Sequence, residues 1–458
     1  MLDFNPSHGS HSSLVRAAPL GGKAARGLGR GRSPRGPRRD EDNRVWMKTL
    51  TGILEWPQRS EGRVRQMAGA TIVESADDPF VPVNFGDQLP LRSGLEVTVE
   101  VVHRKPRRRR RGRPGAPRQS RPVVERFLAI EGLDPERYRE CKPFDELTSI
   151  DPQPRLTLEY PGCPAACRLI DLFCPIGRGQ RGLIVSPPKA GKTTLLKNIA
   201  ESILRNHPEV YVFLLLVDER PEEVTDFRRT FLGPSMPARP NGPPGTNGEP
   251  RPAEPDPRPW GDRVRLIASS NDHDVERHVE VCITCVERCK RMVEAGKHVV
   301  VMLDSLTRVG RAFNRSRKHA SSGRTMTGGI DSRALEVPKQ IFGSARNTEE
   351  AGSLTMLATC LVDTGSQGDQ VIFEEFKGTG NMELILDRKI AEKRLFPAIN
   401  LAASGTRKEH LLMDEQELAT ITALRRRLMS MPPPQQVEQL LAALERFPTN
   451  AQLVGSAR

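Results

Sequence analysis

The residues with the clearest chemical meaning lie in one short run near the middle of the chain. The apolar residues 182–185 are followed by Ser186-Pro-Pro-Lys-Ala-Gly-Lys-Thr193. A loop of this kind, placed between a strand and a helix, presents backbone N–H groups that bind phosphate oxygens. The pattern predicts that Lys192 reaches the β- and γ-phosphates of a nucleotide and that Thr193 gives its hydroxyl to Mg²⁺. Ser186 replaces the usual first glycine, so the match is close but imperfect.

Two acidic residues stand where further apolar runs end. Asp304 closes the run 299–303, and Glu219 follows the run 210–217. Ligands of parallel α/β sheets bind at the carboxyl ends of the strands, so both side chains are expected beside the phosphate loop. We predict that Asp304 serves the metal shell and that Glu219 polarises the attacking water. Asp218 is also a good helix cap, whereas glutamate is a poorer one, which favours the catalytic interpretation of Glu219.

These side chains need a sheet that brings them to one edge. Helical patterns such as 193–205 and 275–295 alternate with apolar runs that are typical of buried strands. Those runs are 182–185, 210–217, 264–268, 299–303 and 354–360. The alternation predicts an α/β fold with a mostly parallel sheet covered on both faces. Upstream, short apolar stretches separated by Gly and Pro between residues 48 and 102 predict a small β-barrel or sheet.

Length and composition divide the chain of 458 residues into several parts. Stretches rich in Gly, Pro, Ser and Arg are not expected to pack, and they separate the patterned regions. The expected order is a disordered basic tail at 1–47, a barrel domain at 48–135 with a polybasic loop at 104–120, a linker at 136–168, an ATPase domain at 169–412 with a disordered Pro-rich insertion at 233–259, and helices at 413–458.

Most of the positive charge lies in one segment. The net charge is +13, and residues 103–121 hold ten Lys or Arg residues without an acid, so the remainder carries only +3. Such a block predicts a polyanionic partner. No run of 18 apolar residues occurs, and the eight scattered cysteines lack the paired spacing of zinc sites. We therefore expect a cytoplasmic protein without a membrane partner.

Nine short runs resemble the transcription termination factor Rho family. The resemblance is nearly continuous from residue 169 to 412 apart from the Pro-rich insertion, and its motifs are specific to this family. The runs are Gly177-Arg-Gly-Gln-Arg-Gly182, Pro187-Pro-Lys-Ala-Gly-Lys-Thr193, Asp218-Glu-Arg-Pro-Glu-Glu-Val-Thr225, Leu303-Asp-Ser-Leu-Thr-Arg308, Thr327-Gly-Gly329, Phe342-Gly-Ser-Ala-Arg-Asn347, Glu374-Glu-Phe-Lys-Gly-Thr-Gly-Asn-Met-Glu383, Arg388-Lys-Ile-Ala-Glu-Lys-Arg394 and Ser404-Gly-Thr-Arg-Lys-Glu409.

The resemblance implies a RecA-like P-loop ATPase core preceded by an oligonucleotide-binding, cold-shock-like barrel. It implies a homohexamer that binds ATP with Mg²⁺ between neighbouring subunits and hydrolyses it in response to single-stranded RNA. It further implies 5′→3′ movement that releases transcripts from the RNA polymerase elongation complex.

Site residues follow from the same resemblance. Glu219 keeps its catalytic role, and Thr193 and Asp304 keep their metal roles. Arg394 and Arg407 match arginines that the family inserts into the neighbouring subunit's site, where a cation in trans supplies roughly 10³–10⁵ in rate. A solvated basic face is the alternative for both arginines. The implied nucleotide contacts are Gly177, Arg178, Gly179, Gln180, Arg181, Gly182, Lys189, Ala190, Gly191, Lys192, Thr193, Thr194, Arg220 and Phe396, whose ring is expected to pack on adenine.

RNA contacts are implied at two pore loops and at the basic block. Arg324 and Thr325 lie in the run that resembles the first pore loop. Gln367 stands in the second, where the family typically has Lys, so one cation is missing from the pore. The basic block contributes Arg107, Arg108, Arg109, Arg110 and Arg111.

The barrel departs further from the family. Ser60-Glu-Gly-Arg63 occupies the place of an aromatic run on which bases stack, so Glu61 and Arg63 replace two rings. Trp56 and Phe80 are either other stacking platforms or core residues. We therefore predict RNA binding that depends steeply on salt and little on base identity.

Two other functions fit part of the sequence. A RecA-like ATPase that turns a protein partner shares the phosphate loop, the carboxylate and the arginine in trans, but it does not predict a polybasic segment. A non-motor RNA-binding assembly protein that works through charge and disorder does not need Lys192.

Overall fold

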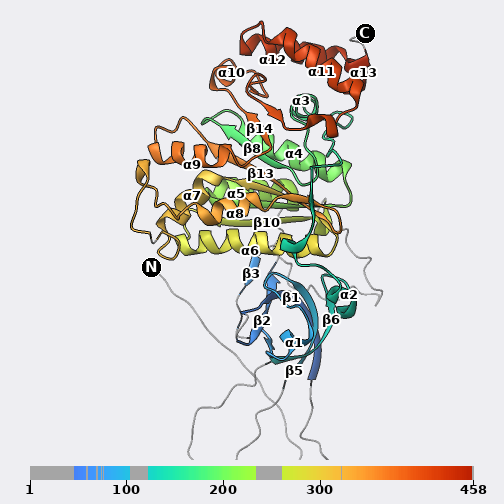
Figure 1. The fold of residues 1–458 in the computed structure, drawn as a ribbon, viewed down its shortest axis with the longest axis vertical. Coiled ribbons are helices and arrows are strands. Elements are labelled where there is room, and N and C mark those ends of the chain that lie inside the picture. The colour runs from blue at the N-terminus through green and yellow to red at the C-terminus, as the bar shows by residue number, and fades with distance from the viewer. Residues whose placement is uncertain are drawn as a thin grey trace, which may run out of the picture. The chain divides into compact units, whose positions relative to one another are not determined.

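The computed structural model describes residues 46–57, 60–68, 71–73, 75, 77–103, 122–233, 260–320 and 322–455. The polybasic loop, nearly all of the predicted basic tail and nearly all of the Pro-rich insertion lie outside the described residues. Residues 46 and 47, which were predicted as the end of the tail, are instead part of the first strand. What is described forms a closed barrel followed along the chain by a mostly parallel sheet with helices on both faces (Figure 1). This is the predicted fold class.

Five strands near the start of the chain close into the barrel, because the first and last strands of the series also pair with each other. In pairing order they are β1 (Trp46–Glu55), β5 (Glu96–His103), β6 (Pro122–Ile130), β4 (Phe80–Val81) and β2 (Gly62–Ala68), with β3 (Thr71–Val73) added to β2 and α1 (Phe85–Gln88) between β4 and β5. Alternate side chains point inward, so Leu54, Val64 and Val97 lie in the barrel core. Trp56 lies there too, only 8% exposed, which makes it a core residue rather than a stacking platform.

Short elements connect the barrel to the large sheet. They are α2 (Pro135–Arg139), η1 (Phe144–Glu146), β7 (Ser149–Ile150) and α3 (Ala165–Phe173). Asp171 of α3 accepts hydrogen bonds from the backbone N–H groups of Leu158 and Glu159, and burial raises its pKa to about 6. These bonds hold the connecting chain against the α/β core.

The large sheet contains every strand that the sequence predicts in this region. Its order is β10-β9-β11-β13-β8-β14-β15, and the first six strands run parallel. The strands are β8 (Arg181–Ser186), β9 (Val210–Glu219), β10 (Val264–Ser270), β11 (His298–Asp304), β13 (Ser353–Leu361) and β14 (Met382–Ile385), with antiparallel β15 (Gly405–Thr406) and β12 (Arg346–Thr348). All parallel strands therefore end at one common edge.

Helices cover both faces of the sheet (Figure 1), and an apolar cluster lies between the sheet and each group of helices. One cluster involves α3, α4 (Lys192–Asn206) and α5 (Pro221–Leu232), and the other involves α6 (Val275–Glu294), α7 (Leu306–Arg315), α8 (Glu336–Gly343) and α9 (Gln367–Lys377). Along β9, Leu214 and Leu216 belong to the first cluster, whereas Leu215 and Val217 belong to the second. A strand buried on both faces explains the unbroken apolar run in the sequence.

The end of the described chain consists of several helices. After α10 (Arg388–Glu392) and η4 (Glu409–Leu411) come α11 (Glu415–Leu428), α12 (Pro433–Arg446) and α13 (Asn450–Gly455). The break before α12 falls at Pro432 and Pro433, because proline is tolerated in the first turn of a helix and not in its interior. Ile421 and Leu440 pack these helices onto the cluster that contains α3 and α4.

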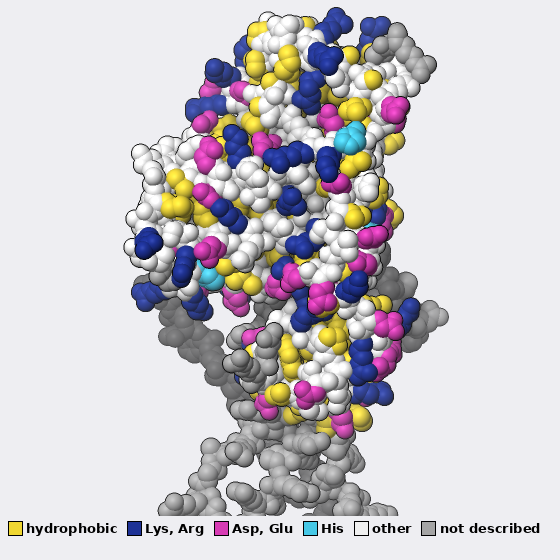
Figure 2. Space-filling view, in the orientation of Figure 1, with side chains coloured by type: hydrophobic (Ala, Val, Ile, Leu, Met, Phe, Trp, Pro, Cys, Tyr) yellow, Lys and Arg dark blue, Asp and Glu magenta, His cyan; other side chains and the backbone are white. Residues whose placement is uncertain are grey.

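The surface of the described residues has mixed charge. Figure 2 shows Lys and Arg side chains interspersed with Asp and Glu over the visible face, with no large area of a single sign. This agrees with a positive excess that lies mainly in the polybasic segment, outside the described residues. Among the described helices, none is long and apolar enough to span a membrane, and all eight cysteines are free thiols.

Candidate active site

The phosphate loop lies where the sequence places it, between the end of β8 and the start of α4. Gly191 precedes α4 with φ +90° and Lys189 has φ +66°, so the loop uses left-handed backbone at two positions. This conformation turns successive N–H groups toward a common concave side, which is the geometry of an anion cradle. Lys189 and Thr194 are exposed, while Ala190 is buried beneath the loop.

Lys192 and Asp304 meet beside this loop. The Lys192 Nζ donates to Asp304 Oδ1 at 2.5 Å, and Thr359 donates its hydroxyl to the same oxygen at 2.9 Å. The other oxygen of Asp304, Oδ2, is buried and has no hydrogen-bond partner in the described part of the chain. A buried unsatisfied carboxylate oxygen, with the Thr193 hydroxyl on the neighbouring helix turn, suits the oxygen-rich outer shell of Mg²⁺.

Glu219 lies on the same edge, one strand away. Its Oε1 accepts hydrogen bonds from Arg308 at 3.0 Å and from the Arg220 backbone N–H at 3.1 Å. Its Oε2 has no hydrogen-bond partner among the described residues and lies 3.9 Å from the Lys192 Nζ. Burial, with Asp304 nearby, raises the pKa of the Glu219 carboxyl. One oxygen is thus anchored, and the other is free to accept a proton from water.

Three further residues complete the site and were not assigned a role from the sequence. Arg308 holds Glu219, Thr359 holds Asp304, and the Glu223 Oε2 lies 3.5 Å from the Thr193 hydroxyl. The role of Arg308 could have been predicted from the sequence, because this residue follows Asp304 by four residues at the start of the next helix. The role of Thr359 could not have been predicted, because this residue lies inside an apolar strand and the sequence does not show which strand lies beside it.

Phe396 is an exposed aromatic ring beside the phosphate loop. Its side chain is 44% exposed, and its ring lies 3.4 Å from the place where a Cβ on Gly191 would stand. An aromatic ring open to solvent at a phosphate loop provides a flat surface for a purine base. We propose that the chain's own nucleotide stacks its base there.

Removing this ring is expected to weaken ATP binding more than it slows hydrolysis. Phe396→Ala should raise the KM for ATP by the equivalent of about 1–3 kcal/mol, the usual value of a base–aromatic stack, with little change in kcat. Steady-state kinetics measure both constants, and Phe396→Tyr, which keeps the ring, is the control. An unchanged KM in Phe396→Ala contradicts the assignment.

Arg394 precedes Phe396, the ring beside the phosphate loop, by two residues in the chain, and its side chain is exposed. The expected insertion into a neighbouring subunit does not follow from this position. We propose instead that Arg394 acts on the nucleotide of its own subunit.

The run Gly177-Arg-Gly-Gln-Arg-Gly182 lies at the other end of β8 from the phosphate loop. Four strand residues, 183–186, separate its last residue from the loop, or about 16 Å from Gly182 to Pro187, so we propose that this run does not contact the chain's own nucleotide. The side chains of this run stabilise the local backbone. Gln180 accepts a hydrogen bond from the Gly177 N–H and donates one to the Asn381 side chain, and Arg178 forms an ion pair with Glu209. Gly179 has φ +87° and approaches Asn347 so closely that a Cβ would lie 2.1 Å from its backbone nitrogen.

Arg407 lies at this same far end of the strands. Its backbone N–H donates to the Asn381 carbonyl at 2.8 Å, and the Asn381 side chain accepts from the Arg181 N–H, also at 2.8 Å. Because β14 and β8 are parallel and in register here, Arg407, Asn381 and Arg181 form a row across the amino ends of the sheet. Arg407 therefore cannot serve the phosphate loop of its own chain.

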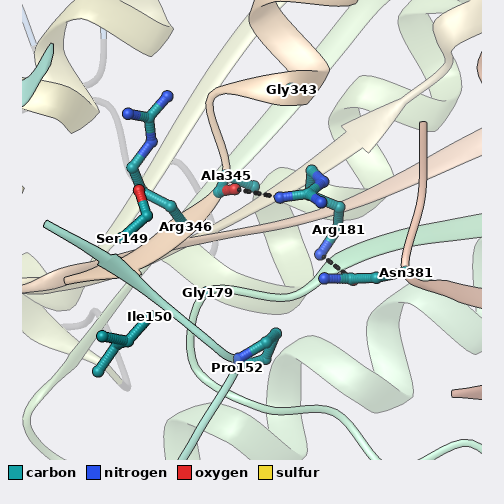
Figure 3. A pocket seen from close by; sticks show the side chains of 9 residues that line it. All are labelled: Ser149, Ile150, Pro152, Gly179, Arg181, Gly343, Ala345, Arg346 and Asn381. Atoms are coloured by element: carbon teal, nitrogen blue, oxygen red, sulfur yellow. Dashed lines mark hydrogen bonds between the residues drawn. The ribbon is translucent and has the colours of Figure 1, made fainter. Parts of the chain in front are cut away.

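A pocket of about 230 Å³ opens beside this row (Figure 3). Its lining includes Arg181, Arg346 and Asn381, and Arg181 donates to the Ala345 carbonyl across it. Burial, together with Arg346 and Arg407 nearby, lowers the pKa of Arg181. Among the described residues, no carboxylate pairs with Arg181, Arg346 or Arg407. The amino ends of the strands thus present uncompensated guanidinium groups.

The two predicted pore segments lie against each other. Gly328 has φ +78°, and a Cβ there would stand 2.8 Å from the backbone of Gln367 and Gly368. Arg324, Thr325 and Gln367 are all exposed at this place. The third predicted group, the arginines of the polybasic loop, lies outside the described residues.

The phosphate loop, the carboxylates at the strand ends and the sheet order together define a P-loop ATPase of the RecA-like class. In agreement, residues 166–406 match the model of the ATP synthase alpha/beta family, nucleotide-binding domain. The chain belongs to the transcription termination factor Rho family. It is 43% identical to transcription termination factor Rho of Aquifex aeolicus, over 88% of this chain and 84% of the relative, and 42% identical to that of Pseudomonas aeruginosa, over 89% and 87%.

A solved structure agrees at the level of the fold. A prototypical ATPase from a bacterial type III secretion system has a TM-score of 0.50 and 21% identity to this chain, and the match covers 68% of this chain and 78% of that one. At this identity the likeness concerns the arrangement of the α/β core alone.

Proposed function

We propose that this protein is the subunit of a hexameric translocase that terminates transcription. It hydrolyses ATP, moves along single-stranded nascent RNA and releases that RNA from the RNA polymerase elongation complex in the cytoplasm. Membership of the Rho family supports ATP-dependent termination, and the nucleotide-binding family match supports hydrolysis. RNA, the ring and the polymerase are proposed for this chain from the family and from the site.

The position of Arg407 is the observation that supports assembly of the subunits into a ring. One chain holds Lys192, Glu219 and Asp304 at the carboxyl ends of its strands and Arg407 at the amino ends. A phosphoryl transition state needs cations around the transferred group, and a second subunit can supply them by placing its amino-end row against the first subunit's phosphate loop. Hydrolysis then depends on contact between subunits, as a rotary or stepping motor requires.

Within this proposal each residue has a distinct task. Lys192 and the loop N–H groups would bind the phosphates, and Thr193 and Asp304 would hold Mg²⁺, which would neutralise charge on the phosphate oxygens. Glu219 Oε2 accepts the proton of the attacking water while Arg308 keeps Oε1 in place. Arg407 of the adjacent subunit stabilises the charge that develops on the transferred phosphoryl group.

One helix provides a path from the nucleotide to the pore. In α7, Arg308 binds Glu219, Arg311 binds Asp369 at the start of α9, and Asn314 binds the Gly329 carbonyl. Positions three residues apart lie near one face of a helix, so a tilt of α7 moves both pore segments together. We propose that hydrolysis is coupled to RNA through this helix.

The barrel offers a mixed surface for RNA. Arg63 and Phe80 are cross-strand neighbours on β2 and β4, and the Arg63 guanidinium lies 4.9 Å from the centre of the Phe80 ring. An arginine on an aromatic ring supplies both a charge for phosphate and a flat surface for a base. We propose that this pair replaces the family's stacked rings.

Restoring a ring at this place is expected to change how RNA is bound. Arg63→Phe should lower the slope of log affinity against log salt by about 1, because one phosphate contact is lost, and should widen the gap in affinity between pyrimidine and purine RNA. Fluorescence titration at several salt concentrations measures both quantities. Arg126→Ala, which removes an exposed arginine on β6, is the control. Equal slopes for Arg63→Phe and the parent protein refute this assignment.

The function is tested by ATP turnover with and without RNA of varied base composition, at two salt concentrations. We expect stimulation by single-stranded RNA and loss of that stimulation at high salt. Turnover that ignores RNA would favour the other ATPase class, in which a RecA-like core works on a protein partner.

A further inference from the structure

Asp218, the residue before Glu219, is an extra residue in the sheet. On the neighbouring strand, Ser269 pairs with Val217 and Ser270 pairs with Glu219, so Asp218 has no partner and forms a bulge. Its φ of +53° is in the left-handed region, which Asp tolerates better than most residues. Glu219 therefore owes its position to an irregularity in β9.

The bulge decides which side of the sheet Glu219 serves. In a regular strand Val217 and Glu219 face the same side, and Val217 packs in the cluster that contains α6. One inserted residue reverses the alternation, so Glu219 turns toward the side of α4, where its Oε2 lies 3.9 Å from the Lys192 Nζ. Asp218 turns toward α6 instead.

Two buried residues behind the bulge meet Asp218 there. His278 of α6 bonds through Nδ1 to the Ser269 hydroxyl at 2.9 Å, and its Nε2 lies 3.9 Å from Asp218 Oδ1. The Ser269 Oγ also accepts the Asp218 backbone N–H at 3.5 Å. One arrangement of protons satisfies all three contacts: Ser269 donates to Nδ1, and the Nε2–H faces the carboxylate. His278 and Ser269 are 5% and 0% exposed, so both bonds are shielded from water.

Arg308 closes the arrangement from the other side. It donates to the Asp218 carbonyl and to Glu219 Oε1, and it lies 3.6 Å from Asp218 Oδ2. The N–H of the bulged residue thus faces Ser269, its carbonyl faces Arg308, and its carboxylate lies between His278 and Arg308. The groups facing His278 are Asp218, Arg308, His273 and Asp274, and burial is the largest influence on its pKa, which is lowered.

We propose that His278 and Ser269 are positioning residues that hold the Asp218 bulge and, through it, hold Glu219 in the orientation needed for hydrolysis. The proposal rests on the proposed ATPase function. Neither residue touches the nucleotide side of Glu219, so their effect is on the placement of the base and not on ATP binding.

A second histidine provides a matched control. His298, at the amino end of β11 and away from Asp304, bonds through Nδ1 to the Ser353 hydroxyl at 3.0 Å. Both histidines bond through Nδ1 to a serine hydroxyl on a strand of the same sheet. A merely structural role predicts that the two leucine variants, His278→Leu and His298→Leu, reduce thermal stability and leave kcat of the folded protein unchanged.

The test compares kcat and KM for ATP in these variants and in His278→Asn, with RNA at saturation. We expect His278→Leu to lower kcat by between about 10- and 100-fold at unchanged KM, because a small misplacement of a reacting group has this effect. His278→Asn, which keeps the bond to Ser269, should recover part of the loss, and His298→Leu should keep full kcat. Equal kcat in the two leucine variants overturns the proposal.

A crystal structure of His278→Leu decides the matter independently of turnover. The expected result is an Asp218 that leaves the left-handed region and a Glu219 carboxylate displaced from Arg308. An unchanged bulge overturns the proposal even if wild-type turnover is normal. Absence of wild-type turnover with RNA instead refutes the proposed function, and the crystal structure still reports on the bulge.

Discussion

ATP turnover in a ring built only from Arg407→Ala subunits is expected to fall by about 10³-fold or more, the range measured for arginines that act in trans. This corresponds to about 4 kcal/mol of lost transition-state stabilisation. Nucleotide binding should be retained, because Arg407 lies at the opposite end of β8 and β14 from the phosphate loop of its own chain. Equilibrium binding of a fluorescent ATP analogue measures the retained step.

Mixing two inactive variants makes this prediction sharper. Arg407→Ala subunits have an intact phosphate loop, and Lys192→Ala subunits have an intact Arg407, so some interfaces in a mixed ring contain both groups. We expect such mixtures to recover turnover. Arg394→Ala is the matched control: because we propose that Arg394 serves the nucleotide of its own chain, mixing this variant with Lys192→Ala should recover nothing. If the mixture of Arg407→Ala and Lys192→Ala subunits recovers no turnover, although mass spectrometry shows that the rings contain both subunits, then Arg407 does not act on the neighbouring subunit's nucleotide.

Glu219→Gln is expected to lower kcat by about 10²–10⁴, the usual contribution of a general base, with ATP binding preserved. The amide keeps the shape and the contact with Arg308, but it cannot take a proton at the free Oε2 position. Steady-state kinetics measure the loss. Glu223→Gln, which alters a carboxylate 3.5 Å from the Thr193 hydroxyl, is the control and should have a much smaller effect.

The same substitution should make the nucleotide-free protein more stable at neutral pH. Burial beside Asp304 raises the pKa of Glu219, so the folded protein binds this proton more tightly than the unfolded chain does. The stability contributed by the proton is present at low pH and is lost as pH rises through the raised pKa. At neutral pH the ionised carboxylate is destabilising, and glutamine removes that effect. A melting temperature in Glu219→Gln below that of the parent protein contradicts this account.

Those residues of the nucleotide site that directly follow a strand could be predicted from the sequence. Lys192, Glu219 and Asp304 each follow a continuous apolar run, and parallel strands bring such ends to one edge. The prediction needed no knowledge of strand order. The fold class followed from the same alternation of strands and helices.

Residues whose role depends on strand order or direction were harder to place. Thr359 reaches Asp304 only because β13 is the neighbour of β11. The run at residues 177–182 precedes the apolar part of β8, so chain order already puts it at the amino ends of the parallel strands, and its contact with the nucleotide was implied by the family resemblance alone. The bulge at Asp218 is likewise invisible in the sequence, because it is defined by the register with β10.

The central claim is that ATP hydrolysis by this chain releases RNA from a transcribing polymerase. The most direct measurement uses halted elongation complexes with labelled transcripts and follows release after adding the protein, with ATP, without ATP, and with Lys192→Ala in place of the parent chain. We predict release by the parent protein with ATP only, and none by Lys192→Ala. Release that is equal without ATP or with Lys192→Ala would contradict the motor and favour a passive RNA-binding protein.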